Sequence, residues 1–215
     1  GWWALSNPDV MAQIGTPAQR EQYAQEWFAA YYSNYPPEDF AAQVWTNNAW
    51  IAARAIALGI TGIGPIYLLV ANAIAIGQAG AMLAEQGMLD VFFGLILPHG
   101  QLELTAIFIA CGAGLKIFWT LVSPGPRTRA RALAEEGRAM ITLVLGLTVV
   151  LLISGVVEGW VPRMDAPAAV KIAIGTLTLA GYWTYTLVLG RIAVRDGETG
   201  DMRADQLDDT VAMAD

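Results

Sequence analysis

Four ionisable side chains stand inside otherwise apolar stretches of the sequence: Arg54, His99, Glu103 and Lys116. His99 and Glu103 are four residues apart, so a helix containing both places them on one face. There the carboxylate could fix the imidazole tautomer or share its proton, as in a proton or solute relay. The pair could also begin a metal site, but two ligands need a third. In its simplest role, the pair makes polar contacts that join a broken helix to its neighbours.

The other polar residues of these stretches suggest partners for the pair. Arg54 needs an acid, and Glu103 is the main candidate within the apolar part of the chain. Lys116 lies near the end of its stretch, where a long side chain can reach the membrane interface, so we expect it to be structural. Charged groups at membrane depth are costly and therefore mark candidate functional sites. The predicted intramembrane polar network consists of Arg54, Asn72, His99 and Glu103.

The apolar stretches are long enough to cross a membrane. Apolar residues make up 55% of the 215 residues and charged residues 14%. No charged residue lies between Arg54 and Glu85, between Arg138 and Glu158, or between Lys171 and Arg191. Because about 20 apolar residues span a bilayer core, the sequence predicts an integral α-helical membrane protein. The net charge of −7 argues against nucleic acid as a partner, and the single cysteine excludes an internal disulfide.

Two groups of helix-disrupting residues divide these stretches. Pro65 follows Gly62 and Gly64 and splits the first stretch, although one kinked helix is an alternative. Pro98 and Gly100 flank His99, so we expect a helix broken at Pro98-His99-Gly100, in a segment that either crosses or re-enters the membrane. The fold class is therefore all-α and polytopic, with about five transmembrane helices near residues 45–63, 66–84, 90–120, 139–157 and 168–190.

Arginine placement predicts the orientation. Residues 121–138 contain four arginines, so this loop should be cytoplasmic. Residues 1–44 then form an extracytoplasmic helical segment, residues 45–190 the transmembrane domain and residues 191–215 an acidic cytoplasmic tail. Because residues 1–44 are expected outside, we also expect a further transmembrane helix before Gly1.

The extracytoplasmic segment contains one clear helix signal. Thr16, Pro17 and Gln19 form a capping box with proline at the first helical position, which predicts an amphipathic helix over 16–33. Helical spacing places Tyr23, Trp27, Ala30 and Tyr31 on one face. That face either packs on the rest of the protein and the membrane surface or binds a partner.

Small residues recur every four positions in two places and predict close helix packing. The two ladders are Ala73, Gly77 and Ala81, and Ala106, Ala110 and Gly114. Such ladders pack helices within one subunit or join two copies, so a homodimer is possible.

One part of the sequence resembles a known family. The segment from Leu97 to Leu104, with its Pro-His-Gly-x-x-Glu-Leu core, is similar to the signature of the stage II sporulation protein M family. Further similar features are Asn47-Asn48, Gly59, Gly62-Ile63-Gly64, Asn72, Ala106-Ile107, Ile109-Ala110 and the run Gly112-Ala113-Gly114-Leu115, so that the resemblance covers about residues 44–190.

The resemblance implies a polytopic plasma-membrane protein of bacteria or archaea. In spore formers the namesake belongs to a septal peptidoglycan-degrading assembly, in which it is a scaffold for partner hydrolases. This chain departs from that pattern in its extra terminal span and acidic tail, which are features of longer relatives in non-sporulating actinobacteria.

We therefore expect a non-enzymatic scaffold in a cell-envelope assembly of the bacterial plasma membrane. Membrane lipids and envelope proteins are its expected partners, and no catalytic residue, metal or cofactor is expected. The sequence has no P-loop, GxSxG or CxxC motif, which agrees with this expectation. The alternative is a permease subunit that moves protons or a small solute past His99 and Glu103. Metal-dependent intramembrane hydrolysis is a weaker third possibility.

Overall fold

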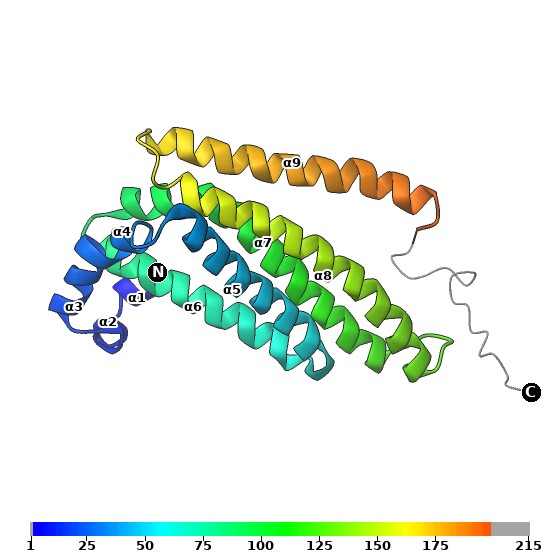
Figure 1. The fold of residues 1–215 in the computed structure, drawn as a ribbon. Helices are drawn as coiled ribbons and strands as arrows, with labels where there is room; N and C mark the ends of the chain where they lie inside the picture. Colours follow the sequence, from blue (N-terminus) through cyan, green and yellow to red (C-terminus); the bar gives the residue numbers. More distant parts are fainter. Residues whose placement is uncertain (1, 199–215) are drawn as a thin grey trace, which may run out of the picture.

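The protein is all-helical, as the sequence predicts. The computed structural model describes residues 2–198, and none of these residues forms a strand (Figure 1). Five long helices form the body: α5 (Pro37–Ala57), α6 (Ile63–Glu85), α7 (Leu89–Val122), α8 (Arg129–Trp160) and α9 (Ala168–Arg195). Short helices precede them: α1 (Trp2–Leu5), α2 (Pro8–Ile14), α3 (Pro17–Gln22), the π-turn η1 (Tyr23–Trp27) and α4 (Phe28–Tyr31).

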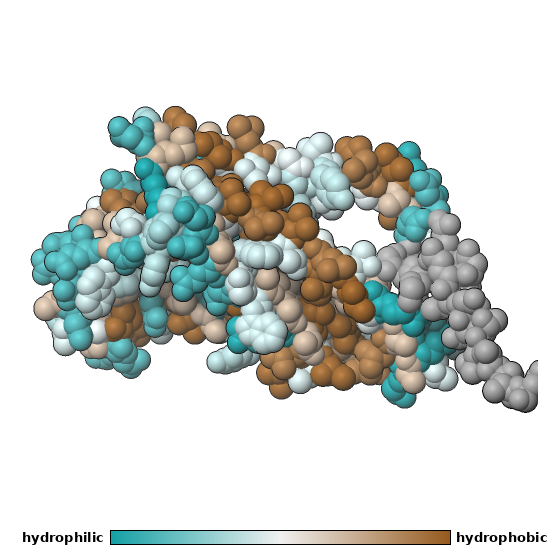
Figure 2. All heavy atoms as spheres, in the orientation of Figure 1, coloured by the Kyte–Doolittle hydropathy of each residue, from teal (hydrophilic) through white to brown (hydrophobic). Residues whose placement is uncertain are grey.

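Helices α6, α7, α8 and α9 are each long and apolar enough to cross a membrane. They correspond to four of the five predicted spans, and the polytopic fold class is confirmed. Figure 2 shows hydrophilic residues gathered over the two ends of the bundle and hydrophobic residues between them. This banding is typical of helices that cross a bilayer along their length.

The fifth predicted span corresponds to α5, which is less apolar than the other four. It contains Asn47, Asn48 and Arg54. It is not among the four helices that are long and apolar enough to cross a membrane. At 21 residues it is still about 31 Å long. It packs against α7 and α8 and connects to α6 at the far end of the bundle (Figure 1). Its crossing of the membrane stays a prediction.

The first apolar stretch divides into two helices, as predicted, but the division falls at Gly62, before Pro65. A short 3-10 turn, η2 (Leu58–Thr61), follows α5, and α6 then begins at Ile63. Gly62 between them has a φ of 69°, a left-handed conformation that glycine adopts without a side-chain clash. Pro65 lies in the first turn of α6, where its missing N–H costs no helical hydrogen bond.

The predicted break at Pro98-His99-Gly100 is wrong. Helix α7 runs without interruption for 34 residues, so this segment is one continuous helix and not a re-entrant hairpin. Pro98 has no N–H to donate to the carbonyl of Gly94. All three residues are buried between neighbouring helices, and this packing holds the backbone helical where the local sequence disfavours it.

The predicted helix over 16–33 exists, but its buried face differs from the expected one. The capping box is present, with Gln19 N–H donating to Thr16 Oγ1 and Thr16 N–H donating to Gln19 Oε1. The π-turn η1 inserts a residue and rotates the following face. Phe28 and Tyr32 are therefore buried, whereas Trp27 and Tyr31 are exposed.

The second small-residue ladder packs within the chain. Ala106, Ala110 and Gly114 are all buried in α7, and a Cβ added to Gly114 would overlap the carbonyl oxygen of Ala55 in α5. In the first ladder only Ala81 is buried and Ala73 is exposed. A homodimer stays a prediction.

Helix α9 lies apart from the rest of the bundle along much of its length. It contacts α7, and only 6% of the residues in its most apolar stretch are buried. In Figure 2 an open gap separates its C-terminal half from the other helices. The predicted boundary at residue 190 falls inside α9, the boundary at 44 falls inside α5, and residues 199–215 of the predicted tail lie outside the described residues.

Candidate functional site

Three ionisable side chains from two helices converge near the end of the bundle that the short N-terminal helices cover. His99 and Glu103 come from successive turns of α7, as their spacing predicts, and Glu158 comes from the last turn of α8. The Nε2 atom of His99 lies 3.6 Å from Oε1 of Glu158. One nitrogen or oxygen atom of each side chain lies within 4.8 Å of the others. The three side chains are therefore close enough to hold one cation between them.

The surroundings of this cluster are well packed. His99 is 6% exposed and Glu158 is 4% exposed. The Asn48 side chain of α5, itself buried, lies within hydrogen-bonding reach of Glu103. Ser154 Oγ donates to the backbone carbonyl of His99 across 3.2 Å and ties α8 to α7. The cluster therefore lies where α5, α7 and α8 meet.

The polar atoms of the cluster are incompletely paired. His99 Nδ1, Glu103 Oε2 and Glu158 Oε2 are buried and have no hydrogen-bond partner. Among the described residues, no lysine or arginine forms an ion pair with Glu103 or Glu158. Buried polar atoms nearly always have a hydrogen-bond partner, so three atoms without one in a single cluster require an explanation.

The structure does not bring the predicted network together as a whole. Arg54 is exposed, and its guanidinium lies 5.8 Å from the centre of the Trp50 ring and not beside Glu103. The Asn72 side chain donates to the Leu68 carbonyl of its own helix. Of the predicted network, His99 and Glu103 alone meet, because Arg54 and Asn72 lie on faces that point elsewhere.

Sequence reasoning missed Glu158 and Asn48. Glu158 follows directly after an uncharged run and lies just outside the predicted span 139–157. In the structure α8 continues past it to Trp160. The signal that could have found it is the Gly155–Gly159 spacing around it, which predicts a close helix contact at that turn.

An aromatic hollow lies next to the cluster. It has a volume of about 420 Å³ and is lined by Tyr23, Trp27, Phe28, Ala30, Tyr31, Tyr32 and Asn34. The lining includes all four residues of the face predicted for the amphipathic helix. Tyr32 belongs to both regions, because its ring centre lies 6.0 Å from that of His99. Burial, with a smaller contribution from the nearby Glu158, raises the pKa of Tyr32, so its hydroxyl stays protonated at neutral pH.

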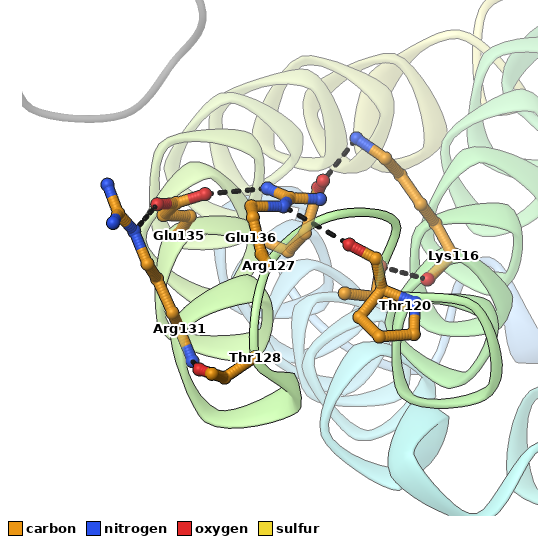
Figure 3. Close-up of polar contacts among 8 residues, drawn as sticks. Lys116, Thr120, Arg127, Thr128, Arg131, Glu135 and Glu136 are labelled. Atoms are coloured by element: carbon orange, nitrogen blue, oxygen red, sulfur yellow. Dashed lines mark hydrogen bonds and ion pairs between the residues drawn. The ribbon is translucent and has the colours of Figure 1, made fainter.

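A second polar cluster holds the turn between α7 and α8 at the other end of the bundle (Figure 3). Glu135 accepts hydrogen bonds from Arg127 across 2.6 Å and from Arg131 across 2.9 Å. Lys116 Nζ lies 2.7 Å from Glu136 Oε2. All of these charges are satisfied locally, so we assign this cluster a structural role.

Comparison with known families identifies the chain. The model of the stage II sporulation protein M family matches residues 1–163, which is most of the chain and includes all three residues of the cluster. The chain belongs to the stage II sporulation protein M family. Searches of curated proteins and of solved structures find no match to this chain.

The extent of the family match differs from the resemblance seen in the sequence. The match includes the N-terminal helices that precede residue 44, and it ends before α9. Helices α1 to α8 are thus the part of this chain that its family shares. Helix α9 lies outside the match, in agreement with the expectation that the last span departs from the family pattern.

Proposed function

We propose that this protein is a non-enzymatic membrane scaffold in a cell-envelope assembly. The observation that carries the proposal is the apolar surface of α9, which the protein itself leaves almost entirely uncovered. Membership of the stage II sporulation protein M family supports it, because the resemblance implies a scaffold for envelope hydrolases.

The surface of α9 is suited to a partner helix. Leu177 is 71% exposed, and Val188 and Ile192 are also exposed on the same helix. Gly181 and Gly190 have no atom within 4 Å of the position of an added Cβ, so both are open to another backbone. Helices associate in membranes through such small residues, because lipid tails offer no hydrophobic driving force for packing.

Site-specific photocrosslinking in native membranes tests the scaffold role. A photoreactive residue at Leu177 should form adducts with a membrane-spanning envelope protein, and reciprocal purification through that partner should recover this chain. The same residue in place of Leu147, which is 3% exposed in the core, is the matched control and should form no intermolecular adduct. Adducts from Leu177 with lipid alone would overturn the proposal.

The second candidate function is a permease that moves protons or a small solute. The clustering of three ionisable side chains between apolar helices favours it, since such groups in membrane proteins often mark transport paths. Proteoliposomes containing the full chain test it, with His99→Ala and Glu103→Gln as variants. Flux that is lost in both variants supports the permease, and flux that is absent or unchanged excludes this relay.

A further inference from the structure

The cluster of His99, Glu103 and Glu158 has the composition of a metal site. It offers one imidazole nitrogen and two carboxylate groups within 4.8 Å of one another. Glu158 is the third ligand that the sequence spacing of His99 and Glu103 alone does not supply. Zn²⁺ binds nitrogen and carboxylate oxygen in this way, often with three protein ligands and one position left for water.

The spacing of His99 and Glu158 agrees with coordination better than with a hydrogen bond. His99 Nε2 and Glu158 Oε1 lie 3.6 Å apart, which is beyond hydrogen-bond length. Two ligand atoms bound tetrahedrally to one Zn²⁺ at about 2.0–2.1 Å lie roughly 3.4 Å from each other. A small rotation of either side chain therefore produces the separation that an ion requires.

The carboxylates of the cluster are neutralised either by a cation or by protons. Glu158 is buried and Glu103 is half-buried with its Oε2 atom buried, and among the described residues neither has a lysine or arginine partner. An unpaired buried carboxylate is expensive, and two together are more so. A divalent cation would neutralise both and give the unpartnered Oε2 atoms of Glu103 and Glu158 an electrostatic partner.

We propose that His99, Glu103 and Glu158 bind one divalent transition-metal ion, with Zn²⁺ as the best fit. The imidazole disfavours Mg²⁺ and Ca²⁺, which prefer sites made of oxygen alone. Asn48 lies within hydrogen-bonding reach of the Glu103 carboxylate and positions this ligand. The bound ion joins α7 to α8 and keeps one coordination position for water or for a group from a partner.

Metal binding to the full chain in detergent tests the proposal. The purified protein is stripped with a chelator, dialysed against Zn²⁺ and analysed for bound metal by mass spectrometry. We expect one Zn²⁺ per chain, and we expect Co²⁺ in its place to give the visible absorption of a tetrahedral site. Zn²⁺ should also raise the melting temperature of the stripped protein.

The variants His99→Ala and Glu158→Gln should each lose at least 100-fold in Zn²⁺ affinity and lose the melting shift. Glu136→Gln is the matched control, because this glutamate lies on the same helix as Glu158 but pairs with Lys116. It should bind Zn²⁺ like the unchanged chain. If a single variant fails to fold, Glu103→Gln with the same readouts provides an independent test, since it removes charge and keeps the shape of the side chain.

Two results would overturn the proposal. One is a stripped protein that takes up no stoichiometric Zn²⁺ or Co²⁺, together with the infrared band of a protonated carboxylic acid that Glu158→Gln removes. In that case the carboxylates are neutralised by protons. The other is Zn²⁺ binding that Glu158→Gln leaves unchanged, which would place the ion elsewhere. Neither result affects the crosslinking from Leu177, so the failures of this proposal and of the scaffold role are distinguishable.

Discussion

Gly175 of α9 packs directly on the carbonyl group of Pro98 in α7. A Cβ added at Gly175 would overlap the carbonyl oxygen and lie 2.6 Å from the carbonyl carbon. Since α9 has few other buried residues, this contact fixes where α9 joins the bundle. It also covers the turn next to His99, so it connects the helix outside the family match to the polar cluster.

The first prediction is that Gly175→Val separates α9 from α7 at this point. Overpacking against a backbone costs about 1–3 kcal/mol, so the melting temperature in detergent should fall. Gly181→Ala is the control on the same helix, because no atom lies within 4 Å of the added Cβ. Replacing a helical glycine by alanine stabilises by roughly 0.5–1 kcal/mol, so this control should melt at the same or a higher temperature. If Gly175→Val and the unchanged chain had the same melting temperature, the close contact of Gly175 with the Pro98 carbonyl would be contradicted.

The second prediction concerns Asn48, which binds Glu103 and not the proposed ion. Residues that orient metal ligands typically contribute 10–100-fold to affinity, so Asn48→Ala should weaken Zn²⁺ binding by about that factor. It should leave the stoichiometry at one ion per chain. Asn47→Ala is the matched control, since Asn47 is the exposed neighbour on the same helix. Isothermal titration of the stripped protein measures the Zn²⁺ affinity and the stoichiometry of each variant. Identical affinities for the two variants would show that Asn48 does not support the site.

The sequence predicts the parts of this structure that local rules determine. The capping box at Thr16, the helix break before Pro65 and the shared face of His99 and Glu103 each follow from spacing within one segment. The break at Pro98 was wrong because a tertiary effect overrides the local rule. Proline disfavours a helix interior, but burial between neighbouring helices holds the segment helical.

The residues that complete the site could not be predicted from the sequence. Glu158 meets His99 only because of the depth and rotation at which α8 packs on α7, and those depend on many side chains at once. The same reason explains why Arg54 does not pair with Glu103. Both lie in apolar stretches, but Arg54 turns outward onto Trp50. Knowing which residues are polar within a span does not determine which of them meet.

The third prediction concerns the attachment of the N-terminal helices. Arg20 is 7% exposed and donates two hydrogen bonds to Glu85 at the end of α6, across 2.7 and 2.8 Å. Arg20→Lys removes this two-bond geometry and should loosen the attachment of the N-terminal helices, because a charged group loses hydrogen-bond partners. Chymotrypsin should then cleave faster at Trp27 and Tyr31. Glu26→Gln changes only the exposed hydrogen bond that Gln22 donates to Glu26 and is the control. Equal cleavage rates in both variants would show that the ion pair does not hold the segment.

The fourth prediction is the orientation of the bundle. The turns after α5 and α7 lie at one end, and the N-terminal helices and the turns after α6 and α8 lie at the other (Figure 1). Arginines at the turn after α7 should place that end in the cytoplasm. In a Cys111→Ala background, Ser33→Cys should react with an impermeant maleimide in intact cells, whereas Ser123→Cys should react only after permeabilisation.

Both serines are exposed, so accessibility within the protein does not decide the outcome. The result also tests whether α5 crosses the membrane. With five crossings, residues 33 and 123 lie on opposite sides, because α5, α6 and α7 separate them. With four crossings and α5 kept on one side, only α6 and α7 separate them, and the two cysteines would label under the same condition. Labelling of both residues in intact cells would therefore show that α5 does not cross the membrane.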